Sequence, residues 1–131
     1  MTPSHAATGV TLLWLRRDLR LSDHPALAAA LDRGGPVVPV YVLDPRLVGG
    51  PRSSANRTWL LLESLREVAG GLAERGAPLV VRTGHPEDVI PALAAEAGAS
   101  AVGASRDVSP FARARDRAVG EALVAAGRQL H

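Results

Sequence analysis

Short apolar runs alternate with longer segments of helical periodicity along this chain. The runs at residues 10–15 and 37–43 are almost continuously apolar, as in strands that are buried on both faces. Two weaker runs follow at residues 79–82 and 101–104. The pattern therefore predicts four strands and a fifth that is cut short where the sequence ends.

Each predicted strand is followed by a segment with helical features. The expected helices begin after Ser22 or Asp23, near Ser53 or Ser54, at Pro86 and at Pro110, and they stop at Gly34, Gly76, Ala97 and Gly127. The second helix gains one apolar face from Leu61, Leu65, Val68 and Leu72. Pro91 lies inside the third helix, which predicts either a later start or a kink there.

This order of elements predicts an α/β fold of the Rossmann-like type. Strands that alternate with helices form a parallel sheet with right-handed crossovers and helices on both faces. Ligands of such folds bind at the carboxyl ends of the strands, near the point where the strand order reverses. In this chain that edge takes in residues 16–20, 44–52, 83–85 and 105–107.

The length and composition suit one domain with an aliphatic core. The chain has 131 residues, of which 47% are hydrophobic and only 3% aromatic. We expect a single domain over residues 10–131, incomplete at its C-terminal end, after a disordered lead-in at residues 1–9. The absence of cysteine excludes disulfides, thiolate metal sites and cysteine nucleophiles. No run reaches the roughly 20 apolar residues of a membrane span, so we expect a soluble, cytoplasmic protein without a membrane partner.

The charge of the chain is nearly balanced. Fifteen basic and 13 acidic residues give a formal net charge of +2, and every basic residue is an arginine. Because arginine does not deprotonate in the accessible range, the sequence pI of about 10.3 overstates the positive field at neutral pH. The arginines are also spread along the chain, which favours a mixed solvated surface over a nucleic-acid footprint.

Several common catalytic and binding motifs are missing. Neither a GxGxxG after the first strand nor a GxxxxGK[ST] occurs, which excludes the usual dinucleotide and triphosphate cradles. The four histidines are isolated, and we expect no metal site. No GxSxG elbow surrounds a serine, and we expect no catalytic residue.

The most informative segment is WLRRDLRLSDHPAL, at residues 14–27. It crowds three arginines and two aspartates into the loop where the first strand gives way to a helix. These guanidinium forks and carboxylates could tie the strand ends together, dock another domain or face an anionic ligand. The residues alone favour structural ion pairs.

The same segment resembles the opening signature of the photolyase/cryptochrome family, W-F-R-R-D-L-R followed by an Asp and by A-L. PVVPVYVLDP at residues 36–45 is similar to the second strand of that family and its Asp-Pro. Residues 53–84 resemble its arginine-bearing helix and next strand, and residues 104–119 resemble the loop and helix that ends in Arg-Asp. The resemblance covers residues 10–125 in order.

The resemblance implies that this is the N-terminal domain, which commonly holds a light-harvesting antenna pigment: a folate, a deazaflavin or a flavin such as FMN. The cofactor-binding residues that it implies are Arg16, Arg17, Asp18, Asp44, Ser105, Arg106 and Asp107. Ser105 stands where the family often has Asn. The implied partners are a C-terminal helical domain that binds FAD and, through the longer parent, damaged DNA.

For that parent, the resemblance implies light-driven repair of pyrimidine dimers by a deoxyribodipyrimidine photolyase, a carbon-carbon lyase. The present chain lacks the FAD-binding domain, and we expect it to be inactive alone. Two alternatives stay open. One is a blue-light photoreceptor of the cryptochrome type, and the other is a free-standing α/β module that binds a nucleotide.

Overall fold

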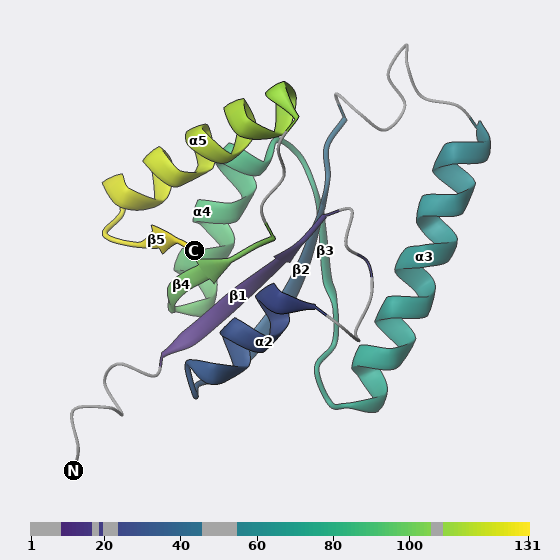
Figure 1. Cartoon of the computed structure of the whole chain (residues 1–131), viewed down its shortest axis with the longest axis horizontal. Coiled ribbons are helices and arrows are strands. Elements are labelled where there is room, and N and C mark those ends of the chain that lie inside the picture. The colour runs from purple at the N-terminus through teal and green to yellow at the C-terminus, as the bar shows by residue number, and fades with distance from the viewer. Residues whose placement is uncertain (1–8, 17–18, 20–23, 46–54, 106–108) are drawn as a thin grey trace.

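The structure is a computed structural model that describes residues 9–16, 19, 24–45, 55–105 and 109–131. Its five strands are β1 Val10–Leu15, β2 Val37–Leu43, β3 Val80–Thr83, β4 Ala99–Gly103 and β5 Gln129–Leu130. Its helices are α2 Pro25–Asp32, α3 Ala55–Glu74, α4 Pro86–Ala97 and α5 Pro110–Ala125. Figure 1 shows them as one sheet with helices on each side.

All neighbouring strands are parallel, and their order is β3-β2-β1-β4-β5. The chain moves outward from β1 through β2 to β3 and then returns to the other side of β1 to form β4. The strand order therefore reverses between β1 and β4, where Leu12 is in register with Val102. This is the place at which open α/β sheets bind ligands.

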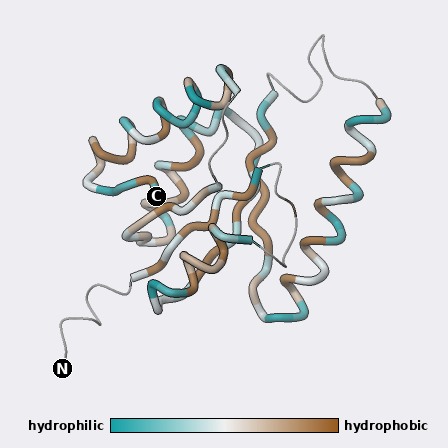
Figure 2. Tube along the Cα trace, viewed as in Figure 1, coloured by the Kyte–Doolittle hydropathy of each residue, from teal (hydrophilic) through white to brown (hydrophobic). Residues whose placement is uncertain are grey.

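The central strand β1 is buried on both faces because its side chains alternate between two cores. Leu12 and Trp14 pack in the core that also contains Ile90 of α4 and Val119 of α5. The intervening Leu13 and Leu15 pack in a second core, against Ala30 of α2 and against Val68 and Leu72 of α3. Figure 2 shows the strands as the hydrophobic centre of the molecule. The predicted α/β fold with helices on both faces is confirmed.

The apolar runs located the strands well, although the boundaries moved by one or two residues. The third and fourth strands occupy residues 80–83 and 99–103, not 79–82 and 101–104. The fifth strand is present as two residues, and its pairing with β4 extends to the last residue of the sequence. The His131 amide donates to the Val102 carbonyl, and the Ala104 amide donates to the His131 carbonyl.

The caps of two helices can be compared with the prediction. Ser109 opens α5 as expected, and its hydroxyl accepts from the Ala112 amide at 3.2 Å. For α2 the prediction was wrong, because the residue directly before the helix is His24. Its Nδ1 accepts from the Leu27 amide at 3.0 Å. Pro25 is the first helical residue, so the cap falls one position after Asp23 and two after Ser22.

Pro91 does not delay the start of α4, which is helical from Pro86 onward. The proline lies six residues into the helix and removes only the amide that would donate to the carbonyl four positions earlier. The neighbouring Ile90 and Leu93 are buried against the sheet and hold the helix in place.

Two further expectations fall wholly or partly outside the described residues. The lead-in expected at residues 1–9 is described only at Gly9, and the starting serines expected for α3 lie just before Ala55. Among the described residues, no helix is both long enough and apolar enough to cross a bilayer.

We expect Leu123→Ala to lower the free energy of unfolding by about 2–5 kcal/mol, because it opens a cavity in a core where Leu123 is fully buried. Urea denaturation followed by circular dichroism measures this loss. The matched control is Val124→Ala, one residue along α5, where the side chain is 65% exposed and the change should stay within about 0.5 kcal/mol. Equal effects of the two substitutions would contradict this packing of α5.

Candidate functional site

An arginine at the carboxyl end of β1 is buried against α5. Arg16 follows the strand directly and is 8% exposed. Its Nη1 donates to Oδ1 of Asp116, a residue of α5 one hundred positions away in the sequence. Its guanidinium lies 4.7 Å from the centroid of the Trp14 ring, within the range of a cation–π contact. The end of the central strand is therefore fastened to α5 by charge and by stacking.

A second arginine joins this cluster from α5 itself. The Nε of Arg115 donates to the same carboxylate oxygen of Asp116 at 3.2 Å. Its guanidinium lies 5.2 Å from the Trp14 centroid and 6.0 Å from that of Phe111. The Arg115 side chain is only 10% exposed, and its Nη2 is buried with no hydrogen-bond partner among the described residues. Two guanidinium groups thus donate to the same carboxylate oxygen, and the Nη2 of Arg115 has no acceptor among the described residues.

The charge of Arg115 in this cluster also affects the pKa of the Tyr41 phenol on β2. Burial raises the pKa of the Tyr41 hydroxyl above its ordinary value, and the positive charge of Arg115 partly opposes that rise. The phenol consequently keeps its proton at neutral pH and can both donate and accept a hydrogen bond.

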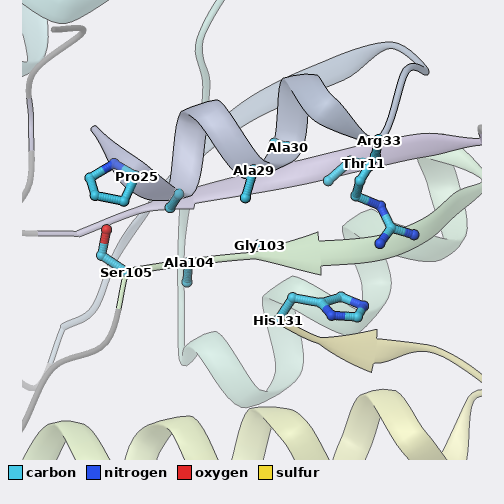
Figure 3. Close-up of a pocket in the computed structure, with 10 residues that line it drawn as sticks. Thr11, Pro25, Ala29, Ala30, Arg33, Gly103, Ala104, Ser105 and His131 are labelled. Atoms are coloured by element: carbon cyan, nitrogen blue, oxygen red, sulfur yellow. The ribbon is translucent and has the colours of Figure 1, made fainter. Parts of the chain in front are cut away.

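The structure separates the predicted site residues onto different faces of the sheet. Arg16 lies with Trp14 on the α5 side, whereas Ser105 lines a cavity beneath α2 (Figure 3). Asp44 is buried directly after β2, at 4% exposure. The remaining predicted positions, Arg17, Asp18, Arg106 and Asp107, lie outside the described residues.

Sequence reasoning missed Arg115 and Asp116 as members of the site. A signal for Asp116 was present in α5. The buried stripe of that helix consists of Ala112, Val119 and Leu123, and Asp116 falls on the same helical face. A carboxylate on an apolar face needs a polar partner across the interface, and Arg16 supplies one.

The fold and the site together define a class of protein. A parallel sheet whose order reverses at its central strand, with helices on both faces, is a Rossmann-like α/β domain. The comparison with protein families is more specific, because the model of the family described as DNA photolyase matches residues 11–131. The chain belongs to the DNA photolyase family.

Relatives of known name agree with this assignment. The chain is 38% identical over 116 residues to a deoxyribodipyrimidine photo-lyase of Agrobacterium fabrum, which covers 88% of this chain and 24% of that protein. It is 40% identical over 105 residues to a chloroplastic/mitochondrial cryptochrome DASH of Arabidopsis thaliana, covering 76% of this chain and 18% of that protein.

A solved structure shares the fold. An archaeal photolyase from Sulfolobus tokodaii superposes with a TM-score of 0.86 at 29% identity, over 92% of this chain and 28% of that one. The chain thus spans about a quarter or less of the length of the two named relatives and little more of this structure.

We expect Asp116→Asn to lower the free energy of unfolding by about 1–3 kcal/mol, because it removes the carboxylate that two buried guanidinium groups share. Urea denaturation measures the loss. The control is Glu63→Gln in the exposed pair with Arg66, where the change should lie between about 0 and 1 kcal/mol. A loss for Asp116→Asn no larger than that of the control would show that the cluster adds nothing to stability.

The ionisation of Tyr41 can be followed directly, because it is the only tyrosine in the chain. Tyrosinate absorbance should reach half of its final value above pH 10 or so in the folded protein. The substitution Arg115→Gln should move this midpoint still higher, because it removes a charge that favours the phenolate. The free energy of unfolding should be insensitive to this group below about pH 10 and should fall above it. A midpoint at the ordinary value in the folded chain would contradict the burial of the phenol.

Proposed function

We propose that this chain is the antenna domain of a photolyase, which binds a light-harvesting pigment at the carboxyl edge of its sheet. The observation that carries the proposal is the Arg16, Arg115 and Asp116 cluster stacked on Trp14 at the end of the central strand. A bound pigment would absorb near-ultraviolet or blue light and pass excitation energy to an FAD elsewhere in a longer parent protein.

The chemistry of the cluster fits such a pigment. Folates, deazaflavins and flavins are flat ring systems with carbonyl oxygens, and folates and FMN also carry an acidic tail. The buried Nη2 of Arg115 is a donor that an acceptor on such a ring or tail would satisfy. Phe111, 42% exposed and close to the same guanidinium, offers an aromatic surface for stacking. The Sulfolobus tokodaii photolyase supports this role, because it was solved with two FAD molecules, which imply a novel light-harvesting cofactor in that protein.

The proposed pigment residues are those at the carboxyl edge. Arg16 lies at the end of the central strand and Asp44 directly after the next one, whereas the Tyr41 ring packs in the core on the α2 and α3 side. We retain Arg17, Asp18, Ser105, Arg106 and Asp107 as further candidates. These residues bind and orient a pigment, and none is assigned a catalytic role.

For the longer parent, we propose repair of pyrimidine dimers in DNA, with FAD bound in a separate domain. A blue-light photoreceptor is the second candidate, because a cryptochrome DASH is 40% identical to this chain. Dimer repair by the full-length parent under blue light would separate the two, since a pure photoreceptor leaves the dimers intact.

The proposal is tested by mixing the purified chain with a folate, a deazaflavin and FMN in turn and recording absorbance after desalting. We expect one of them to remain bound. Arg115→Gln should weaken that binding about tenfold, because a charge-assisted hydrogen bond is lost. The control is Arg113→Gln, which changes an exposed arginine of the same helix. A folded chain that retains none of the three pigments would overturn the antenna role.

A further inference from the structure

Helix α2 begins at a histidine whose ring nitrogen acts as a hydrogen-bond acceptor. His24 directly precedes the helix, and its Nδ1 accepts from the Leu27 amide at 3.0 Å. The residue is buried, at 6% exposure. An imidazole nitrogen can accept a hydrogen bond only while it carries no proton. This cap of α2 therefore exists only in the neutral form of His24.

A proton on His24 would turn this attractive contact into a repulsive one. Both ring nitrogens of an imidazolium are donors, so an N–H at Nδ1 would face the N–H of Leu27. The positive charge would also lie at the N-terminus of a helix, where the helix dipole favours anions and disfavours cations. The first turn of α2 contains no acidic residue that would offset this charge.

The elements packed against α2 bring few ionisable groups to it. The helix packs on β1 and β4, and neither strand contains a titratable residue. The described charged and titratable groups around the helix are Asp32 and Arg33 at its far end, Arg16 after β1, Tyr41 and Asp44 at β2, and His131 after β5. None of them belongs to the first turn of α2. Asp23, the preceding residue, lies outside the described residues.

A second helix with the same His-Pro start serves as a comparison within the molecule. His85 precedes α4 and Pro86 is its first residue, but the His85 side chain makes no cap hydrogen bond. The first turn of α4 also carries Glu87 and Asp88. A proton on His85 would thus break no cap bond and would have two carboxylates in the adjoining turn. Of these two helices, only α2 depends on a neutral imidazole.

The first turn of α2 forms part of the wall of a cavity of about 430 Å³. Pro25 and Ala26 of this turn line the cavity together with Gly103 and Ala104 at the end of β4, as Figure 3 shows for three of the four. The cavity lies where the strand order reverses between β1 and β4, which is the place at which α/β sheets bind ligands. Movement of this turn would therefore change access to that part of the sheet.

We propose that His24 is an acid-sensitive switch, whose protonation releases the first turn of α2 and opens the cavity beneath it. Histidine suits this role because its charge ordinarily changes between about pH 5 and pH 8. The switch goes beyond the antenna function, since it requires no pigment and belongs to the chain itself.

Amide hydrogen exchange of the isotopically labelled chain, followed by NMR between about pH 7.5 and pH 5, tests the proposal. The Leu27 amide reports on the cap, and the ring signals of His24 report on its protonation. After correction for the intrinsic effect of pH on exchange, we expect the protection of Leu27 to fall about fivefold as His24 takes up a proton, because a helix loses its N-cap acceptor. The reference is the Ala112 amide, which is capped by the Ser109 hydroxyl and should keep its protection.

Matched substitutions assign the pH response to one ring. His24→Asn keeps an uncharged acceptor at the N-cap and should make the protection of Leu27 independent of pH. His85→Asn changes the corresponding residue of α4 and should leave the response of Leu27 intact. Asp23→Asn should leave it intact as well.

The methyl signals of two alanines report on the cavity. Those of Ala26 and Ala104, which line it, should shift in the same pH range as the Leu27 amide. The methyl signal of Ala73, on the exposed surface of α3, is the control and should not shift.

Three results would overturn the switch. They are a folded chain in which His24 stays neutral down to about pH 5, a protonated His24 with unchanged protection of Leu27, and a pH response that survives in His24→Asn. The experiment contains no pigment, so none of these results bears on the antenna role. A chain that fails to retain a pigment would equally leave the behaviour of α2 to be decided by the exchange measurement.

Discussion

The structure depends on the burial of β1 from four directions. The strand pairs with β2 and β4 at its edges, and its side chains enter a separate core on each face. Thr11 is the only polar residue of this strand, and the first charged side chain appears only where the strand ends, at Arg16. The strict alternation of side chains then decides that Arg16 joins Trp14 on the α5 side, and the charged cluster forms where the sheet stops being apolar.

Asp116 is the counter-charge that the buried Arg16 requires at the end of β1. A guanidinium buried beside an aromatic ring is costly without a nearby counter-charge, and α5 supplies one from its apolar face. The same carboxylate accepts from Arg115, whose buried Nη2 has no hydrogen-bond partner among the residues that the structure describes. One acidic residue therefore accepts hydrogen bonds from two cations and fixes their geometry at the end of the central strand.

The strands and helices could be predicted because each depends on a local pattern: β1 and β2 are almost continuously apolar, and α3 repeats leucine and valine at helical spacing. The cap at His24 was missed because serine and aspartate are the commoner caps and both stood nearby. The pairing of Arg16 with Asp116 could not be predicted from local patterns, since it depends on how α5 is rotated against a strand one hundred residues earlier. The placement of Ser105 on the other face likewise depends on the phase of β4, which no short motif encodes.

The return of the chain to β1 also sets the order in which the molecule can assemble. The first half, from β1 to β3, contains neighbours that are close in sequence, but β4 must close a loop of more than eighty residues to reach β1. Contacts between distant residues slow folding because the entropy of loop closure is lost before the contact forms. During synthesis the N-terminal half emerges first, and the edge of β1 that later pairs with β4 stays unpaired until β4 has been made. The charged cluster, which joins the end of β1 to α5, is then among the last contacts to form, so its presence reports that both halves of the sheet have come together.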